Sequence, residues 1–435
     1  MSCKLMRATL LCSVALAATP RSAGAVEIQY NLDFGIERND NLLLTPEDPI
    51  EDTILRPGLG FSLTHESSTW QTEFTGRGEY LIYQDDRFDD TLEGVLSGRA
   101  NWIVLPERLS FTVEDDLTVQ PVNTFLPDGP GNRQQVNVIS LGPTLFFNLG
   151  QTLQGAAELR YINSDAEITE EFNSDRVNFA LRATKELDPT SALSANLQVQ
   201  RVDFDFDLVA RDYDRTDFYA RYTRSLASID LALDAGISRI DYRRGGGNRS
   251  EPLFRVQGTW HPSARQSLSL RASSQFSDTA SDALAGIGAE GEAMPGSVPV
   301  GEAVVNASPY EERGFELRYT YTTPRTTVVV APYYNRLRYI DTDDFDQNTS
   351  GLRADVNWLA RPRFTLGAYG GVGRIEYVRL DGTDKTSEFG AYADYRWTRH
   401  LSSRLSVMRQ ERDLTAFGSS ATQNVLLLTV SYHNR

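Results

Sequence analysis

The residues best placed to do chemistry are charged side chains that recur at every second position along many segments. Side chains two positions apart on a β-strand share one face of the sheet. An arginine on a lipid-facing surface costs about 2–4 kcal/mol at mid-depth, so a membrane strand keeps such residues on its other face. If the strands close into a barrel, these residues predict a polar interior, or lumen, with fixed charges of both signs. The alternative is a lumen that is closed by salt bridges between these side chains. The predicted lumen residues are Glu73, Arg77, Glu93, Arg99, Arg160, Arg182, Arg255, Arg318, Arg353, Asp355, Asp394 and Arg396.

Candidates for catalysis are few. Histidine is the commonest general base, and the sequence has four: His65, His261, His400 and His433. All four fall at short connections between strands or near the end of the chain. A hydrolase built on a membrane barrel would need its histidine within the membrane or at the outer end of the barrel. Both cysteines, Cys3 and Cys12, lie in the first 25 residues, which leaves the remaining chain without a cysteine nucleophile or a zinc-thiolate site. We expect no catalytic residue and no enzymatic activity.

Acidic runs and a glycine-rich stretch are the remaining candidates for ligand binding. The densest acidic runs are Asp85–Asp90, Asp203–Asp207 and Asp341–Asp346. Calcium prefers clustered oxygen ligands, but none of these runs has the glycine and terminal glutamate of an EF-hand loop. Solvated loop charge is the better interpretation. Gly367, Gly370, Gly371 and Gly373 fall in one strand-like segment rather than in a phosphate-binding loop. We expect no metal site and no cofactor.

The first 25 residues have the pattern of a secretory signal peptide. Lys4 and Arg7 precede the short apolar run Leu10–Ala18, and Ala23-Gly24-Ala25 is a small-residue cleavage site. Cleavage near Ala25 would leave residues 26–435 as a single domain. The signal contains three bases and no acid, so its removal changes the net charge from −16 to −19. Such an acidic chain is not expected to bind nucleic acid through a basic surface.

The elements that carry the charged faces are predicted to be long β-strands. Phe315, Leu317 and Tyr319, for example, alternate with Glu316 and Arg318. No segment after the signal has the roughly 18 or more apolar residues of a membrane-spanning helix. A closed barrel is the other structure that satisfies every backbone polar group in hydrocarbon. Tryptophans at the ends of the apolar stripes are typical of the aromatic girdles of such barrels, and they are Trp70, Trp102, Trp260, Trp358 and Trp397.

The connections alternate between tight turns and longer polar stretches. Tight turns near Pro106-Glu107 and Arg361-Pro362, for example, alternate with longer stretches such as Val122–Arg133. This order predicts an all-β, transmembrane, antiparallel up-and-down β-barrel of about 18–20 strands, with short periplasmic turns and longer extracellular loops, in the outer membrane of a Gram-negative bacterium. The loop at 277–310 is unusually long. Either it folds into the barrel and narrows it, or it is a mobile outer loop, and the base rate for long loops favours the second interpretation.

One stretch near the start of the mature chain resembles a known family. Asn39-Asp40-Asn41-Leu42, Leu44-Thr45-Pro46, Asp52-Thr53-Ile54 and Pro57-Gly58-Leu59 are similar to the start of the EpsL-like outer-membrane barrels, also called β-barrel porin type 2. The resemblance implies a conduit linked to exopolysaccharide export. It also implies polysaccharide and export-machinery proteins as partners, in addition to membrane lipid and lipopolysaccharide. The alternatives are a general or solute-specific diffusion porin, a barrel enzyme, and a non-conducting assembly or adhesion platform.

Overall fold

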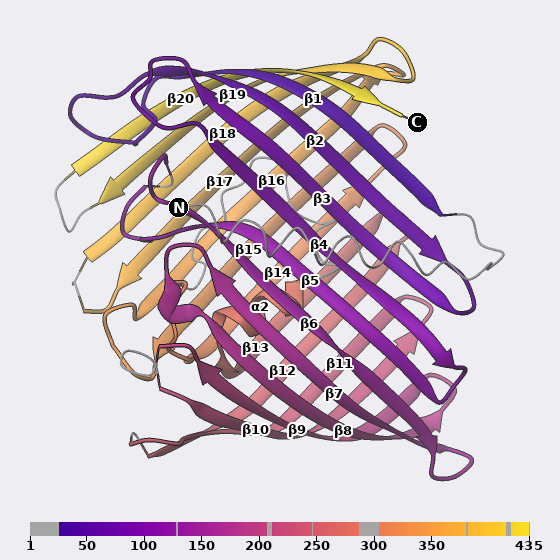
Figure 1. Ribbon diagram of the computed structural model, residues 1–435. Helices are drawn as coiled ribbons and strands as arrows, with labels where there is room; N and C mark the ends of the chain where they lie inside the picture. The colour runs from indigo at the N-terminus through magenta and orange to yellow at the C-terminus, as the bar shows by residue number, and fades with distance from the viewer. Residues whose placement is uncertain are drawn as a thin grey trace.

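The protein folds into one closed ring of antiparallel β-strands (Figure 1). The computed structural model describes residues 26–127, 129–206, 211–245, 247–286, 304–379, 382–414 and 419–434. Each strand pairs with its neighbours in the chain, and β1 also pairs with β20, from Asn31 opposite His433 to Asn39 opposite Val425. The predicted fold class is therefore confirmed. The strand number is 20, the upper end of the predicted range.

The strands are 12 to 16 residues long, which exceeds the 9–11 residues or so that a tilted strand needs to cross hydrocarbon. Their bounds are β1 Glu27–Asn39, β2 Asp52–Glu66, β3 Trp70–Tyr83, β4 Thr91–Leu105, β5 Leu109–Pro121, β6 Arg133–Asn148, β7 Leu153–Ala166, β8 Ser174–Asp188, β9 Ser191–Phe204, β10 Tyr213–Leu226, β11 Ile229–Tyr242, β12 Asn248–Ser263, β13 Gln266–Ser277, β14 Tyr310–Thr322, β15 Thr326–Tyr339, β16 Gln347–Arg361, β17 Phe364–Tyr377, β18 Gly382–Arg396, β19 Leu401–Leu414 and β20 Ser419–His433.

Among the described residues, two short helical segments interrupt the connections: the 3₁₀ turn η2 at Glu170–Phe172 and the helix α2 at Thr279–Gly286. No helix among the described residues has the length and apolar character to cross a membrane. The expected signal peptide lies outside the described residues.

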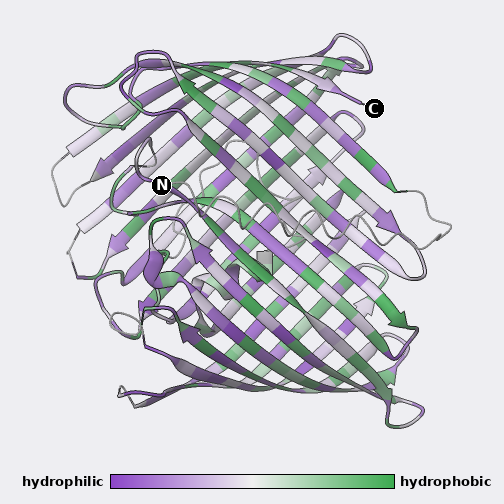
Figure 2. Cartoon of the chain, in the orientation of Figure 1, coloured by the Kyte–Doolittle hydropathy of each residue, from purple (hydrophilic) through white to green (hydrophobic). Residues whose placement is uncertain are grey.

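The alternation of side chains sorts the two faces of the ring. On β1, Leu32, Phe34 and Ile36 are 42–50% exposed on the outside, whereas Glu37 and Asn39 are buried on the inner face. Figure 2 shows the same alternation of hydrophobic and hydrophilic residues along the strands. Because soluble proteins rarely expose such a large contiguous apolar surface, the outside has the character expected of a surface that contacts lipid.

The two rims of the barrel differ. Very short turns join the strands at one rim, where the ladder bends back within a few residues, as at Ser67 and Trp70. The rings of Trp70 and Trp102 stack outside this rim, with centroids 5.6 Å apart. Trp260, Trp358 and Trp397 are 47–55% exposed near the same rim, as in an interfacial aromatic girdle. We call this rim the turn rim and the opposite one, with the longer connections, the loop rim.

Replacing Phe34 with arginine should destabilise the barrel in lipid by about 2–4 kcal/mol, because the charge would sit at mid-strand on the apolar outside. Denaturant titration of the protein folded into phospholipid vesicles measures the change. Phe34→Leu, which keeps an apolar side chain, is the matched control. Equal stability of the arginine and leucine variants would contradict the assignment of this face to lipid.

Candidate functional site: the lumen and its two inward loops

Two loops from the loop rim fold into the lumen and contact distant parts of the inner wall. The first joins β13 to β14, and the structure describes its two ends, 278–286 and 304–309. Figure 1 shows α2 inside the ring. There Ala280 and Val305 pack in one buried cluster with Val136 and Val138 of β6 and with Ile162 of β7. The described ends of the loop at 277–310 therefore lie inside the barrel. This agrees with the first interpretation given above, in which the loop folds inward.

Asp278 anchors the start of α2 to the inner wall at β8 and β10. Its carboxylate accepts hydrogen bonds from the backbone N–H (3.1 Å) and the hydroxyl (2.8 Å) of Ser281, which is the pattern of a helix N-cap. The same carboxylate pairs with Arg176 of β8, and Tyr213 of β10 donates to it at 3.3 Å.

The Arg176–Asp278 pair is almost wholly enclosed, with the two side chains 2% and 6% exposed. Burial alone would raise the pKa of Asp278. The Arg176 guanidinium and the hydrogen bonds from Ser281 and Arg176 outweigh it, so the pKa of Asp278 is lowered. Removing one partner of a buried pair costs about 3–5 kcal/mol, because the other charge is left uncompensated. The loop is therefore held firmly at this end.

The second inward loop joins β5 to β6 and contacts the wall formed by β15 to β19. The Phe125 ring lies between Tyr377 and Phe345, with centroid distances of 4.9 and 6.2 Å. Arg412 of β19 donates to the Phe125 carbonyl oxygen at 3.1 Å and is itself held by Asp384 of β18, from Nε to Oδ2 at 2.7 Å. We call the contacts of Phe125 with Tyr377, Phe345 and Arg412 the Phe125 latch.

Below these loops a cavity of about 1510 Å³ follows the inner wall of β1–β3 and β16–β20. Its lining begins at Leu42 of the β1–β2 connection and Gly129 of the β5–β6 loop. It ends at Pro362, Arg399 and His433, beside the turn rim. The cavity therefore extends between the two rims of the barrel.

Fixed charges of both signs line the cavity. Arg56 bridges Glu37 and Glu79, and its Nη2 lies 2.7 Å from Glu79 Oε2. Across the cavity Arg404 makes a two-point contact with Asp394, at 2.7 and 2.9 Å. Such two-point guanidinium–carboxylate contacts fix the geometry of the groups as well as their charge. A solute in this space meets positioned donors and acceptors on both sides.

The predicted lumen residues have the following placements. Arg77, Asp394 and Arg396 line the large cavity. Glu73 lies opposite Arg99, which pairs with Glu114. Arg133 donates to Glu93 at 2.9 Å, and Arg160 donates to the Thr144 hydroxyl at 2.8 Å. Arg182 donates to Asn196 at 3.0 Å, Arg255 pairs with Asp234 at 2.9 Å, and Arg318 pairs with Glu316 at 3.3 Å. Arg353 lies 4.8 Å from the Tyr333 ring centroid, and Asp355 accepts from Asn357 at 2.6 Å.

Sequence reasoning missed both loop anchors. Neither Arg176 nor Arg412 is among the predicted lumen residues, yet both are buried on the inner face of strands β8 and β19. One signal was present for the first anchor. Asp278 is a residue type favoured at helix N-caps, and it immediately precedes the alanine-containing segment that forms α2.

The other candidates from the sequence have structural explanations. The four histidines lie at the turn rim, where the His400 ring nitrogen is 2.9 Å from the His433 carbonyl oxygen. Gly367 to Gly373 are strand residues of β17. Within the described residues, no group of three or more His, Cys, Asp or Glu side chains is arranged to hold a metal.

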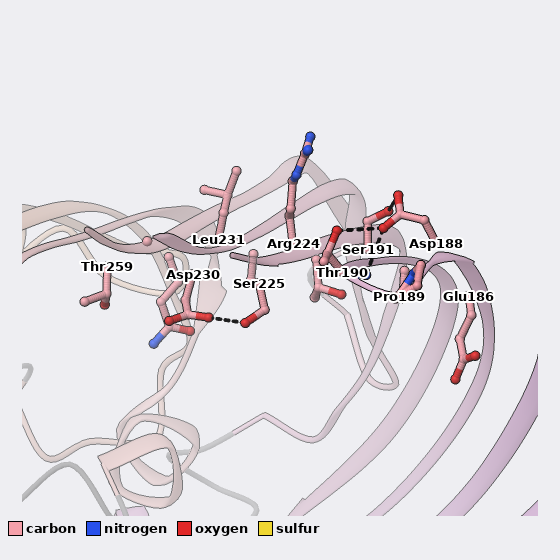
Figure 3. Close-up of a pocket in the computed structure, with 15 residues that line it drawn as sticks. Glu186, Asp188, Pro189, Thr190, Ser191, Arg224, Ser225, Asp230, Leu231 and Thr259 are labelled. Atoms are coloured by element: carbon pink, nitrogen blue, oxygen red, sulfur yellow. Dashed lines mark hydrogen bonds between the residues drawn. The ribbon is translucent and has the colours of Figure 1, made fainter. Parts of the chain in front are cut away.

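A second hollow, of about 610 Å³, lies at the turn rim between β8 and β12 (Figure 3). Asp188 accepts hydrogen bonds there from the hydroxyls of Thr190 and Ser191, and Asp230 accepts one from Ser225. Neighbouring hydroxyl groups thus already occupy both carboxylates, so we take the larger cavity as the candidate site.

Comparison with known proteins gives similarity to solved structures only. No family model and no curated protein matches the chain. OccK2 (OpdF) of Pseudomonas aeruginosa aligns with a TM-score of 0.41 and 11% identity over 94% of this chain and 97% of that one. The ferric enterobactin receptor PfeA of the same organism gives 0.46 and 9% identity over 94% and 81%. The FrpB iron transporter of Neisseria meningitidis gives 0.43 and 9% identity over 93% and 82%.

Replacing Phe125 with alanine should raise the single-channel conductance, because the β5–β6 loop would lose its ring contacts with Tyr377 and Phe345 and could leave the lumen. Planar-bilayer recording measures the effect. Leu126→Ala, on the same loop but with a 54% exposed side chain, is the matched control and should conduct like the parent. Unchanged conductance in Phe125→Ala would show that the latch does not restrict the pore.

The conductance should also depend on pH through Asp282 of α2, which accepts hydrogen bonds from Ser277 and Tyr310. Part of its surface is accessible within the lumen. The surrounding protein nevertheless desolvates the carboxyl group, and this, with the nearby carboxylates of Glu312 and Asp278, raises the pKa of Asp282 to about 7. The folded loop thus binds the proton more tightly than a released loop would, so the anchor loses stability as the pH rises toward and through 7.

We therefore expect a larger or noisier current at pH 8 than at pH 6. In Asp282→Asn, which stays neutral at both pH values, this difference should disappear. A pH dependence that persists unchanged in Asp282→Asn would assign it to another group.

Proposed function

We propose that this protein is an outer-membrane pore of a Gram-negative bacterium, exported with a cleaved signal peptide, that passes small polar solutes. The observation that carries the proposal is the charged cavity that extends from the inward loops to the turn rim. Barrels of 16 to 18 strands already leave an aqueous channel, and a 20-stranded ring is wider. The apolar outside and the girdle of tryptophans support the placement in a membrane.

The inward loops favour a selective pore over a wide, unrestricted one. Both loops reach a distant stretch of the inner wall. The buried Arg176–Asp278 pair holds the first loop there, and hydrogen bonds from Arg412 to the loop backbone hold the second. A solute must pass beside them and contact the charged wall. Pores that pass solutes in this way select by diameter and by the donors, acceptors and charges of their lining.

A second candidate is a conduit for an exported polysaccharide, the function implied by the family resemblance. The observation that favours it is a set of tyrosine side chains in the lumen, Tyr333, Tyr369 and Tyr392, beside carboxylate and guanidinium groups. In this role the protein would work with export-machinery proteins. Because the inward loops restrict the lumen, a polymer strand would pass only after they move.

The reconstituted protein should conduct ions across a planar bilayer, with a selectivity that depends on the lumen charges. Arg77→Gln removes a positive charge from the cavity wall and should shift the reversal potential in a salt gradient toward cation selectivity. Arg38→Gln is the matched control. Arg38 pairs with a carboxylate and is equally exposed (48% against 49%), but it points outward on β1. Absence of any current from correctly folded protein would contradict the pore, and equal shifts in both variants would contradict the assignment of the lumen.

For the polysaccharide conduit, the informative experiment is deletion of the gene. Full export of the polymer by the deletion strain would count against this second candidate while leaving the solute pore intact.

A further inference from the structure

Three lumen tyrosines have an unusual setting in the wall formed by β15 to β18. Each lies directly opposite a glycine on the next strand: Tyr333 opposite Gly351, Tyr369 opposite Gly390, and Tyr392 opposite Gly367. A Cβ atom added to any of the three glycines would overlap ring atoms of its tyrosine. The tip of each ring therefore lies over the glycine of the neighbouring strand instead of pointing across the lumen.

The three rings form a descending series. Their heights can be compared along β16. Tyr333 pairs with Gly351 of β16, and Tyr369 pairs with Asp355 of β16. Tyr392 pairs with Gly367 of β17, which in turn pairs with Asn357 of β16. Residues two apart on a strand are separated by about 7 Å. The series thus runs from the loop rim toward the turn rim across neighbouring strands, and Tyr369 and Tyr392 line the large cavity.

Hydrogen-bonding groups of both signs border these rings. The Arg404 guanidinium lies 4.5 Å from the centroid of Tyr392 while it binds Asp394 at two points. The Arg353 guanidinium lies 4.8 Å from the centroid of Tyr333. Among the described residues, no arginine or lysine lies over the Tyr369 ring. Of the three rings, Tyr369 is therefore the one on which a ligand can stack.

Beside Tyr369 the wall contains an incomplete hydrogen-bond network. Asp355, which is only 4% exposed, accepts from Asn357 through Oδ1, but its Oδ2 atom is buried and has no hydrogen-bond partner. Leaving a buried acceptor unsatisfied costs about 1–3 kcal/mol, more for a charged group. A ligand that brings a donor to this position would recover that energy.

We propose that Tyr369, together with Asp355, Asn357 and Arg404, forms a subsite for one pyranose ring of a neutral saccharide. The proposal rests on the proposed pore function and names a substrate class for it. A pyranose has an apolar C–H face, which can stack on an aromatic ring, and a rim of hydroxyl groups that both donate and accept hydrogen bonds. Its hydroxyls donate to the carboxylates and accept from the guanidinium, which satisfies both signs of charge on this wall.

Other small ligands fit the wall less well. An anion would be repelled by Asp355 and Asp394, and a cation by Arg353 and Arg404. A planar aromatic molecule could stack on Tyr369 but would leave most of the bordering donors and acceptors unpaired, which is costly in an enclosed site. The volume of the cavity, about 1510 Å³, exceeds that of usual small-molecule pockets, which suits an oligosaccharide.

The test is the block of ion current by maltohexaose in planar bilayers. The parent protein should show a concentration-dependent block. Tyr369→Ala should weaken the block at least about fivefold, if a sugar face stacks on an aromatic ring as a base does, with on the order of 1–3 kcal/mol, since about 1.4 kcal/mol is a factor of ten. Tyr369→Phe keeps the ring and should stay close to the parent. Tyr30→Ala removes an exposed tyrosine on the outside of β1 and should leave the block unchanged.

Folding of each variant is checked by the heat-dependent shift in gel mobility that folded barrels show. Asp355→Asn, on β16, provides a second variant should Tyr369→Ala fail to fold. It should also weaken the block, because it removes the unpartnered carboxylate acceptor of the subsite. Block that is absent in the parent, or equal in the parent and the alanine variant, overturns the subsite. Stronger block by tetragalacturonate than by maltohexaose overturns the preference for a neutral ligand.

Equilibrium dialysis of maltohexaose against detergent-solubilised protein separates failure of the subsite from failure of the pore. Binding that depends on Tyr369, in a protein that passes no current, would retain the subsite and overturn the pore. Current without sugar binding would retain the pore and overturn the subsite.

Discussion

The closed hydrogen-bond ladder is the constraint on which the rest of this structure depends. Inside a bilayer an unpaired backbone N–H or C=O group costs several kcal/mol, because no water can replace the missing partner. The pairing of β1 with β20 removes the two free edges that an open sheet of this size would have. Once the ring is closed, the twofold repeat of each strand directs alternate side chains to lipid and to the lumen. The position of every charged residue follows from that alternation.

The same closure creates the need for the inward loops. A ring of 20 strands is too wide for its own side chains to fill. Here the chain fills part of the space with connections from the loop rim. The buried Arg176–Asp278 pair holds one of them, and Arg412, which is paired with Asp384, donates to the backbone of the other. Between these anchors and the turn rim, the charged side chains of the wall line a cavity, where they can contact a solute.

The sequence predicted the barrel well because the information is local. The alternation of Phe315, Leu317 and Tyr319 with charged residues can be read without knowing any partner strand. The sequence is less clear between β9 and β10, where the aspartates after Arg201 continue the polar pattern of the loop into the strand end. The structure resolves it because Tyr213 pairs with Val202, which fixes where each strand ends.

The loop anchors and the tyrosine series could not be predicted in this way, because their partners are distant in the chain. Phe125 meets Arg412 across the lumen, and Arg176 is 102 residues from Asp278. The placement of Tyr369 on Gly390 depends on the register of β17 against β18, and a slip of one residue would turn every side chain of the strand to the other face. A single sequence contains the residues but not the pairing that brings them together.

The two inward loops also have a mechanical consequence. A wide, single-layered cylinder resists bending along its strands but yields easily to pressure that flattens its cross-section. The loop from β13 is tied to the wall at β6 to β8, and the loop from β5 to the wall at β15 to β19. They act as braces between separate stretches of the wall, so that lateral pressure from a crowded membrane is carried through the interior and the bore keeps its shape.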